Sequence, residues 1–207
     1  MKVEDLAALA VSACEEEGVA FMVTGAFACG YCGIPRSTKD VDLVLGVEDR
    51  SGIERVIARL APDVDFGAQV QFDTLTWGRR HVGHAKACPA LQVELFELFD
   101  DPFVQAQFER RVMRYSGQLN RQTWLPTAED VVVQKLRWGR NKDLDDARDV
   151  LAVQGPETLD MDYISRWCEI HGTATRLREA LDGIPPDHLY LDPGGVCLRL
   201  QILRFRP

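Results

Sequence analysis

The chain has 207 residues, of which 46% are hydrophobic, and its 32 acidic and 24 basic residues give a formal charge of −8. This length is enough for one sizeable core, or for one core with a small helical appendage. So acidic a chain is a poor candidate for binding nucleic acid indiscriminately. No apolar run approaches the roughly 20 residues that a membrane-spanning helix needs, and the mixed charges of the first residues are unlike a secretory signal. We therefore expect a cytoplasmic protein, and the six scattered cysteines fit reduced thiols there.

The first half of the chain alternates between helical and extended patterns. Apolar residues at helical spacing predict a packing helix over residues 3–17, and Gly18 follows where a helix commonly ends. A short buried strand over residues 19–23 leads into a turn at Gly25 and a helix to about residue 31. The elements predicted next are a central strand over 41–45, a crossover helix over 48–60, strands over 70–77 and 91–99, and a short helix over 101–108.

The second half is predicted to be mainly helical. Its elements are a hairpin of residues 111–115 and 122–125, a helix from Thr127 to 138, a helix over 144–153 with Asp143 as its N-cap, and helices over 158–170 and 173–181. Residues 191–207 read as an edge strand or a loose tail. The domains we expect are a core over 1–126, a helical region over 127–183 and a tail over 184–207.

Two acidic residues in the predicted central strand point to metal binding. Asp40 and Asp42 are separated by one residue in an apolar run, so both side chains project from one face of an extended strand. Their charges repel each other, and a divalent cation would turn the two carboxylates into a ligand set. Gly25 and Ala26 supply a tight turn and a small residue at a helix start, where backbone N–H groups can approach a phosphate. Either motif alone is usually a solvated strand end or a turn, so the information lies in their order and spacing.

In this order, the segments resemble the nucleotidyltransferase superfamily with its DNA polymerase β-like fold, and in particular small bacterial AbiE-type toxin-like proteins. The similarity covers residues 25–28 (GAFA) and 36–43 (RSTKDVDL), then a second block over 127–130 (TAED), 135–136 (KL) and 139–146 (GRNKDLDD). It implies an α+β fold with a mixed, twisted sheet flanked by helices and a small C-terminal helical region. Ala26 departs from the Gly or Ser usual in that family, which removes a hydroxyl contact but keeps the side chain small.

The resemblance also implies a reaction. A nucleoside monophosphate would be moved from an NTP to an acceptor hydroxyl, at an RNA 3′ end or on a protein side chain, by a toxin-type enzyme with a cognate antitoxin. Asp40 and Asp42 would hold two Mg²⁺ ions, which Mn²⁺ can replace, and a carboxylate on the adjacent strand would complete the site. That carboxylate is Glu94 or Glu97, and only one of them can point toward the aspartates because they lie on opposite faces of a regular strand. We favour Glu94.

Further residues are assigned by the same resemblance. The nucleotide-binding set is Gly25, Ala26, Arg36, Thr38 and Lys135, and the partners that would support it are Asp143, Asp146 and Arg140. Residues 110–142 carry eight basic and two acidic side chains, which make either a solvated face or a positive wall for a triphosphate or RNA. Two other functions stay open: a catalytically inactive nucleotide-binding or regulatory protein on the same fold, and an enzyme that modifies a small molecule of the antibiotic type.

One stray motif has the spacing of a metal site. Cys29 and Cys32 form a Cys-x-x-Cys pair, and His81, His84 and Cys88 could supply further zinc ligands. Because the second group is irregularly spaced, buried cysteines on the helix after the glycine turn are the preferred interpretation.

Overall fold

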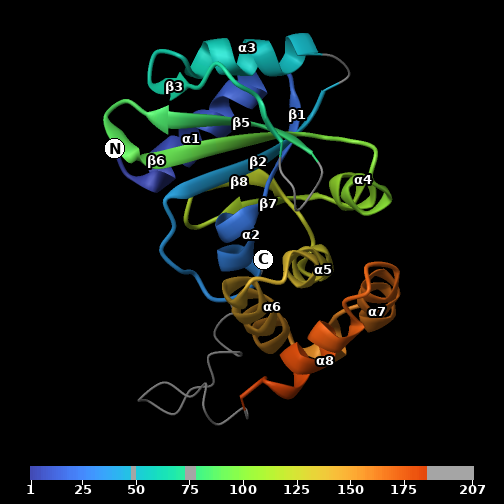
Figure 1. Ribbon diagram of the computed structural model, residues 1–207. Coiled ribbons are helices and arrows are strands. Elements are labelled where there is room, and N and C mark those ends of the chain that lie inside the picture. The colour runs from blue at the N-terminus through green and yellow to red at the C-terminus, as the bar shows by residue number, and fades with distance from the viewer. Residues whose placement is uncertain (48–49, 73–77, 186–207) are drawn as a thin grey trace, which may run out of the picture. The chain divides into compact units, whose positions relative to one another are not determined.

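The computed structural model describes residues 1–47, 50–72 and 78–185 (Figure 1). The chain forms two compact units: unit 1 comprises Met1–Tyr31 and Pro35–Thr127, and unit 2 comprises Cys32–Ile34 and the chain from Ala128 onward. Within the described residues, no helix is long and apolar enough to cross a membrane. The predicted strand or tail over residues 191–207 lies outside the described residues.

A six-stranded mixed sheet forms the framework of unit 1. Its strands are β1 (Ala20–Val23), β2 (Asp40–Gly46), β3 (Val64–Phe66), β4 (Gln71–Phe72), β5 (Arg79–Ala85) and β6 (Cys88–Glu97). The order is β1-β2-β6-β5-β3, and β4 also pairs with β5. Strand β2 runs parallel to β6 and antiparallel to β1, and the remaining pairs are antiparallel. The α+β class is therefore confirmed, and the Asp-x-Asp strand β2 lies inside the sheet, next to the edge strand β1.

One face of this sheet is the main core of unit 1. The side chains of β2 and β6 that point to it are fully buried: Val41, Leu43, Leu45, Val93 and Leu95. Helix α1 (Val3–Glu16) packs against β1, β2 and β6, and α3 (Arg50–Leu60) packs on α1 (Figure 1). Fully burying one such aliphatic side chain contributes about 1.5–3 kcal/mol. The apolar side chains of β2 are therefore held in the core, and the alternate side chains of the strand must point away from it.

An apolar cluster covers one end of the opposite face of the sheet. Val44 of β2 and Met22 of β1 form a cluster with Phe108 of α4 (Pro102–Glu109), and Phe96 packs against it. The side chain of Asp101 caps α4 by accepting from the N–H groups of Phe103 and Val104, both at 3.0 Å. The cluster occupies the end of β2, so the start of the strand, with its two aspartates, is left half-buried on this face.

Several predicted boundaries need correction. Residues 79–85 form β5, which the sequence did not predict; the strand predicted over 70–77 is described only as β4, and its residues 73–77 lie outside the described part. The predicted hairpin is confirmed as β7 (Val112–Ser116) and β8 (Arg121–Leu125). Helix α2 (Gly25–Cys32) follows the glycine turn, as predicted.

Unit 2 is helical. Its elements are α5 (Ala128–Trp138), α6 (Asn141–Gln154), the 3-10 turn η1 (Pro156–Thr158), α7 (Met161–Ile170) and α8 (Ala174–Asp182). The prediction of Asp143 as an N-cap is wrong: α6 begins at Asn141 with Arg140 as N-cap, and Asp143 is the third helical residue, accepting from the Arg140 N–H. The short segment Cys32–Ile34 belongs to this unit because the carbonyl of Cys32 accepts from the Gln154 side chain and Gly33 lies against Val150.

Candidate active site

Asp40 and Asp42 lie at the start of β2 on the face opposite to the core. Their side chains are half-buried, whereas Val41 and Leu43 between and after them point into the core and are fully buried. The hydroxyl of Thr38 accepts from the Asp40 N–H at 3.1 Å and lies 3.3 Å from the Asp40 carbonyl, to which it donates. Thr38, which the resemblance assigns to nucleotide binding, therefore also fixes the backbone of the first aspartate.

The Gly25 turn brings the start of helix α2 against Asp42. Gly25 has φ +62°, in the left-handed region that glycine adopts without strain, and a Cβ at this position would lie 1.8 Å from Oδ2 of Asp42. The adjacent Thr24 N–H donates to the Asp42 carbonyl at 2.9 Å. Glycine is thus required for two reasons, its backbone conformation and the close carboxylate. The positive end of a helix beside a carboxylate is electrostatically favourable.

Glu94 is the carboxylate that the strand register brings beside Asp42. In the parallel pair of β2 and β6, Asp42 is in register with Glu94 and Leu45 with Glu97. Paired residues share a face, so Glu94 lies on the face of the two aspartates and Glu97 lies on the other. The side chain of Glu94 is 15% exposed.

The carboxylate oxygens of Asp40 and Asp42 fit a magnesium ion, because Mg²⁺ in proteins is commonly held by one or two carboxylates together with water and substrate phosphates. Across residues 1–47, 50–72 and 78–185, however, no group of three or more His, Cys, Asp or Glu side chains is arranged to hold a metal ion. Glu94 is engaged elsewhere: its Oε2 accepts from Nη1 of Arg80 at 3.0 Å.

Arg80 is a residue of this site that the sequence reasoning missed. It lies on β5, in register with Phe96 of β6 and with Gln71 of β4. Its Nε and Nη2 donate to Oε1 of Gln71 at 3.2 and 3.0 Å, while Nη1 donates to Glu94. Arg80 becomes a candidate only when β5 is known to pair with β6, and the local sequence does not reveal that pairing.

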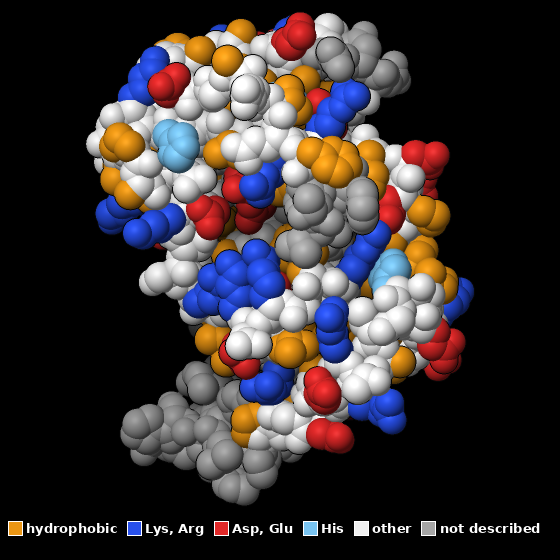
Figure 2. Space-filling view, in the orientation of Figure 1, with side chains coloured by type: hydrophobic (Ala, Val, Ile, Leu, Met, Phe, Trp, Pro, Cys, Tyr) orange, Lys and Arg blue, Asp and Glu red, His pale blue; other side chains and the backbone are white. Residues whose placement is uncertain are grey.

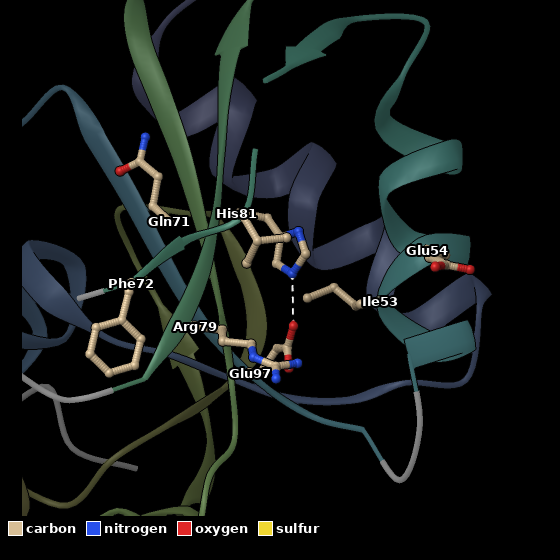
Figure 3. A pocket seen from close by; sticks show the side chains of 8 residues that line it. Ile53, Glu54, Gln71, Phe72, Arg79, His81 and Glu97 are labelled. Carbon is tan, nitrogen blue, oxygen red and sulfur yellow. Dashed lines mark hydrogen bonds and ion pairs between the residues drawn. The ribbon is translucent and has the colours of Figure 1, made fainter. Parts of the chain in front are cut away.

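A pocket of about 360 Å³ opens on the other face of the same sheet, between β5, β4 and α3 (Figure 3). The ring of His81 donates from Nε2 to Oε1 of Glu97 at 2.9 Å, and Arg79 forms a longer ion pair of 3.8 Å with Glu97. Ile53 of α3 and the exposed ring of Phe72 give the pocket apolar walls. The carboxylate of Glu97 therefore binds His81 and Arg79 on the face of the sheet opposite to Asp40 and Asp42.

Lys135 is buried within unit 2. It is 3% exposed, and its Nζ donates to Oδ1 of Asp143 at 3.2 Å and to Oδ2 of Asp146 at 2.7 Å. Asp143 also accepts from Nε of Arg140 at 2.6 Å, and the Arg140 side chain is 46% exposed. Both cations lie near the Trp138 ring, at 5.1 and 5.3 Å from its centre. This network joins α5 to α6, and the phosphate contact assigned to Lys135 stays a prediction.

The basic residues of segment 110–142 are divided between the two units, and in unit 1 two of them are engaged with neighbouring side chains and backbone. Arg111 packs on the rings of Phe108 and Trp124, and Arg121 donates to the Ala8 carbonyl and to Ser12 on α1. Figure 2 shows that both basic and acidic side chains are exposed on the face of the molecule that it displays. Arg36 is exposed in the loop before β2, with its Nη1 3.5 Å from the Ser37 carbonyl.

The residues of the stray zinc motif have other surroundings. Cys29 and Cys32 are buried on α2, at 3% and 4% exposure. His81 is bonded to Glu97, and Nδ1 of His84 donates to the Pro89 carbonyl at 3.1 Å.

The fold matches solved structures, although no protein-family model and no curated protein matches the sequence. The crystal structure of ANT(2'')-Ia in complex with adenylyl-2''-tobramycin has a TM-score of 0.57 at 13% identity, covering 81% of this chain and 98% of its own. The solution structure of the same antibiotic-resistance factor has a TM-score of 0.55 at 12% identity, covering 86% and 93%. A proposed nucleotidyltransferase from H. pylori has a TM-score of 0.52 at 16% identity, covering 97% and 88%. At these identities the likeness shows the fold, which is the predicted nucleotidyltransferase fold.

Proposed function

We propose that this protein is a magnesium-dependent nucleotidyltransferase that moves a nucleoside monophosphate from an NTP to a hydroxyl of RNA or protein. The observation that carries the proposal is the register of β2 and β6, which sets Glu94 beside Asp42 while the Gly25 turn sets the start of α2 against the same carboxylate. Two aspartates, a third acid and a helix start are thereby joined in unit 1, on a fold shared with ANT(2'')-Ia.

Each residue would contribute by position or charge. Asp40 and Asp42 would hold Mg²⁺ through their carboxylate oxygens, and the ion supplies charge neutralisation for the phosphates and lowers the pKa of the attacking hydroxyl. The N–H groups of Gly25 and Ala26 at the start of α2 would bind phosphate oxygens, and Arg36 would add positive charge from the exposed loop. Thr38 would keep the Asp40 backbone fixed.

The reaction balances without another reactant. The acceptor oxygen forms a bond to the α-phosphorus of the NTP, and the bond from that phosphorus to the β-phosphate oxygen breaks. Pyrophosphate leaves with the electron pair, and the hydroxyl proton passes to water. Because the chain needs to form no covalent intermediate, its contribution is positioning and electrostatic stabilisation.

The test is transfer of label. Purified protein is incubated with Mg²⁺, each α-³²P-labelled NTP in turn and cell extract, and the products are then digested with RNase or with protease. Label that is lost to one of the two digestions identifies the acceptor class. Asp42→Asn should abolish transfer without changing the circular dichroism spectrum, and Glu97→Gln, a carboxylate on the opposite face, should leave transfer intact. Transfer that survives Asp42→Asn refutes the assignment.

A small-molecule acceptor is the second candidate. It is favoured by the match to ANT(2'')-Ia, a protein solved with an adenylylated tobramycin and matched over nearly its whole length. The same assay with ATP and a panel of aminoglycosides in place of extract separates the two classes. If transfer to RNA or protein makes this protein a toxin with a cognate antitoxin, induced expression of the wild type should arrest growth and Asp42→Asn should not. Metal-dependent NTP binding without transfer to any acceptor would identify an inactive nucleotide-binding protein.

A further inference from the structure

The guanidinium group of Arg80 is held on the same sheet face as the three carboxylates of the candidate site. Of its five N–H groups, three donate to described residues: one to Glu94 on β6 and two to the Oε1 atom of Gln71 on β4. These two strands flank β5 in the sheet, so Arg80 is fixed from both sides. A cation anchored in this way does not need to reorganise when a substrate arrives.

The charges on this face suit one divalent ion better than two. Asp40, Asp42, Glu94 and Arg80 together carry a net charge of −2, which one divalent cation neutralises. The Arg80 side chain is 31% exposed and that of Glu94 is 15% exposed, so solvent screens their attraction only partly. A guanidinium has donors and no acceptor, and it therefore competes with a metal for Glu94 without itself becoming a ligand.

We propose that Arg80 takes the place of the second metal ion: the site binds a single divalent cation at Asp40 and Asp42, while Arg80 stays on Glu94 as the second positive charge. This inference rests on the proposed function and changes the two-ion expectation that the family resemblance gave. The two Arg80 N–H groups that no described residue uses would face the substrate phosphates, so Arg80 would be a binding residue as well as a positioning one.

The experiment counts bound metal. The full chain is titrated with Mn²⁺ alone, and the free ion is followed by electron paramagnetic resonance. The wild type should bind one Mn²⁺ and Asp42→Asn none. Arg80→Gln should bind two, because the guanidinium group no longer occupies Oε2 of Glu94 and removal of a nearby unit charge strengthens cation binding about tenfold. Arg80→Lys retains the charge and should bind one. Arg79→Gln is the matched control, since Arg79 is the adjacent arginine paired with Glu97 on the other face, and it should also bind one.

The outcomes separate this inference from the proposed function. Two Mn²⁺ ions on the wild type, or one ion on a folded Arg80→Gln protein, would overturn the role of Arg80 and leave nucleotidyl transfer standing. No binding to the wild type would overturn the single-ion site, and the labelling assay then decides nucleotidyl transfer separately, because substrate phosphates can supply metal ligands that the titration lacks. A measurement that needs no variant is a crystal of the wild type soaked in Mn²⁺: one anomalous peak at Asp40 and Asp42 supports the inference, and a second peak at Glu94 contradicts it.

Discussion

Replacing Gly25 by alanine tests whether the glycine turn exists to make room for Asp42. A left-handed backbone costs a residue with a Cβ roughly 1–2 kcal/mol, and Gly25 has φ +62°. The new Cβ would also lie 1.8 Å from Oδ2 of Asp42. That side chain must rotate away, at a further cost of about 0.5–1.5 kcal/mol if it leaves its preferred rotamer. The total, roughly 1.5–3.5 kcal/mol, should lower the melting temperature by about 3–14 °C, since each kcal/mol corresponds to about 2–4 °C in a chain of this size.

Gly18→Ala is the control that separates the two costs. Gly18 has φ +63°, nearly the same as Gly25, but nothing lies within 4 Å of a Cβ there. Its alanine variant should lose only the backbone contribution of roughly 1–2 kcal/mol and should bind Mn²⁺ normally. Thermal unfolding and the Mn²⁺ titration are measured on both proteins. If Gly25→Ala is no less stable than Gly18→Ala and binds Mn²⁺ as the wild type does, then Asp42 is not displaced and the reasoning fails.

Two further predictions concern unit 2. Lys135→Met leaves the buried carboxylates of Asp143 and Asp146 without their ammonium partner, so the free energy of unfolding measured in urea should fall by about 3–5 kcal/mol. The control is Lys142→Met at an exposed position, which should change the free energy of unfolding little. Equal effects of the two substitutions would contradict the network. Burial, assisted by Asp146 and Asp145, raises the pKa of Asp149 above its usual range. The folded state therefore holds this proton more tightly, and stability is lost as pH rises through the folded pKa. Asp149→Asn should accordingly be more stable than the wild type at pH 7 and equal to it below about pH 4; an unchanged difference between the two pH values would refute this.

Sequence patterns over a few residues predicted the helix start and the strand face that depend on neighbouring residues alone. Asp101 before Pro102 marked the start of α4 because its side chain can cap the first N–H groups. Alternation of acidic and apolar residues marked β2, since one face of that strand is core and the other is not. Strand periodicity established that only one of Glu94 and Glu97 can face Asp42. The preference for Glu94 came from the family resemblance, and the register pairs Glu94 with Asp42.

Features that depend on pairing between distant strands were not predictable. Residues 79–85 (RRHVGHA) have little β-branched or aromatic content, and they form β5 because β6 on one side and β3 and β4 on the other supply its hydrogen bonds. Without β5 there was no reason to connect Arg80 with Glu94, 14 residues later. Asp143 and Asp146 were expected as partners of Lys135 from the family resemblance, but the burial of Lys135 was not predicted, because it depends on the packing of α5 against α6.

Helix α2 has a consequence for any attempt to shorten this protein. Its first residue touches Asp42 in unit 1, and its last residue, Cys32, belongs to unit 2 together with Gly33 and Ile34. The polypeptide thus crosses from one unit to the other three times, so the helical unit is not a detachable C-terminal extension. A fragment that stops at Thr127 would keep residues 32–34 while losing Val150 and Gln154, which they pack against. Helix α2, which begins beside Asp42, would then end in the segment Cys32–Ile34 without the side chains that this segment packs against.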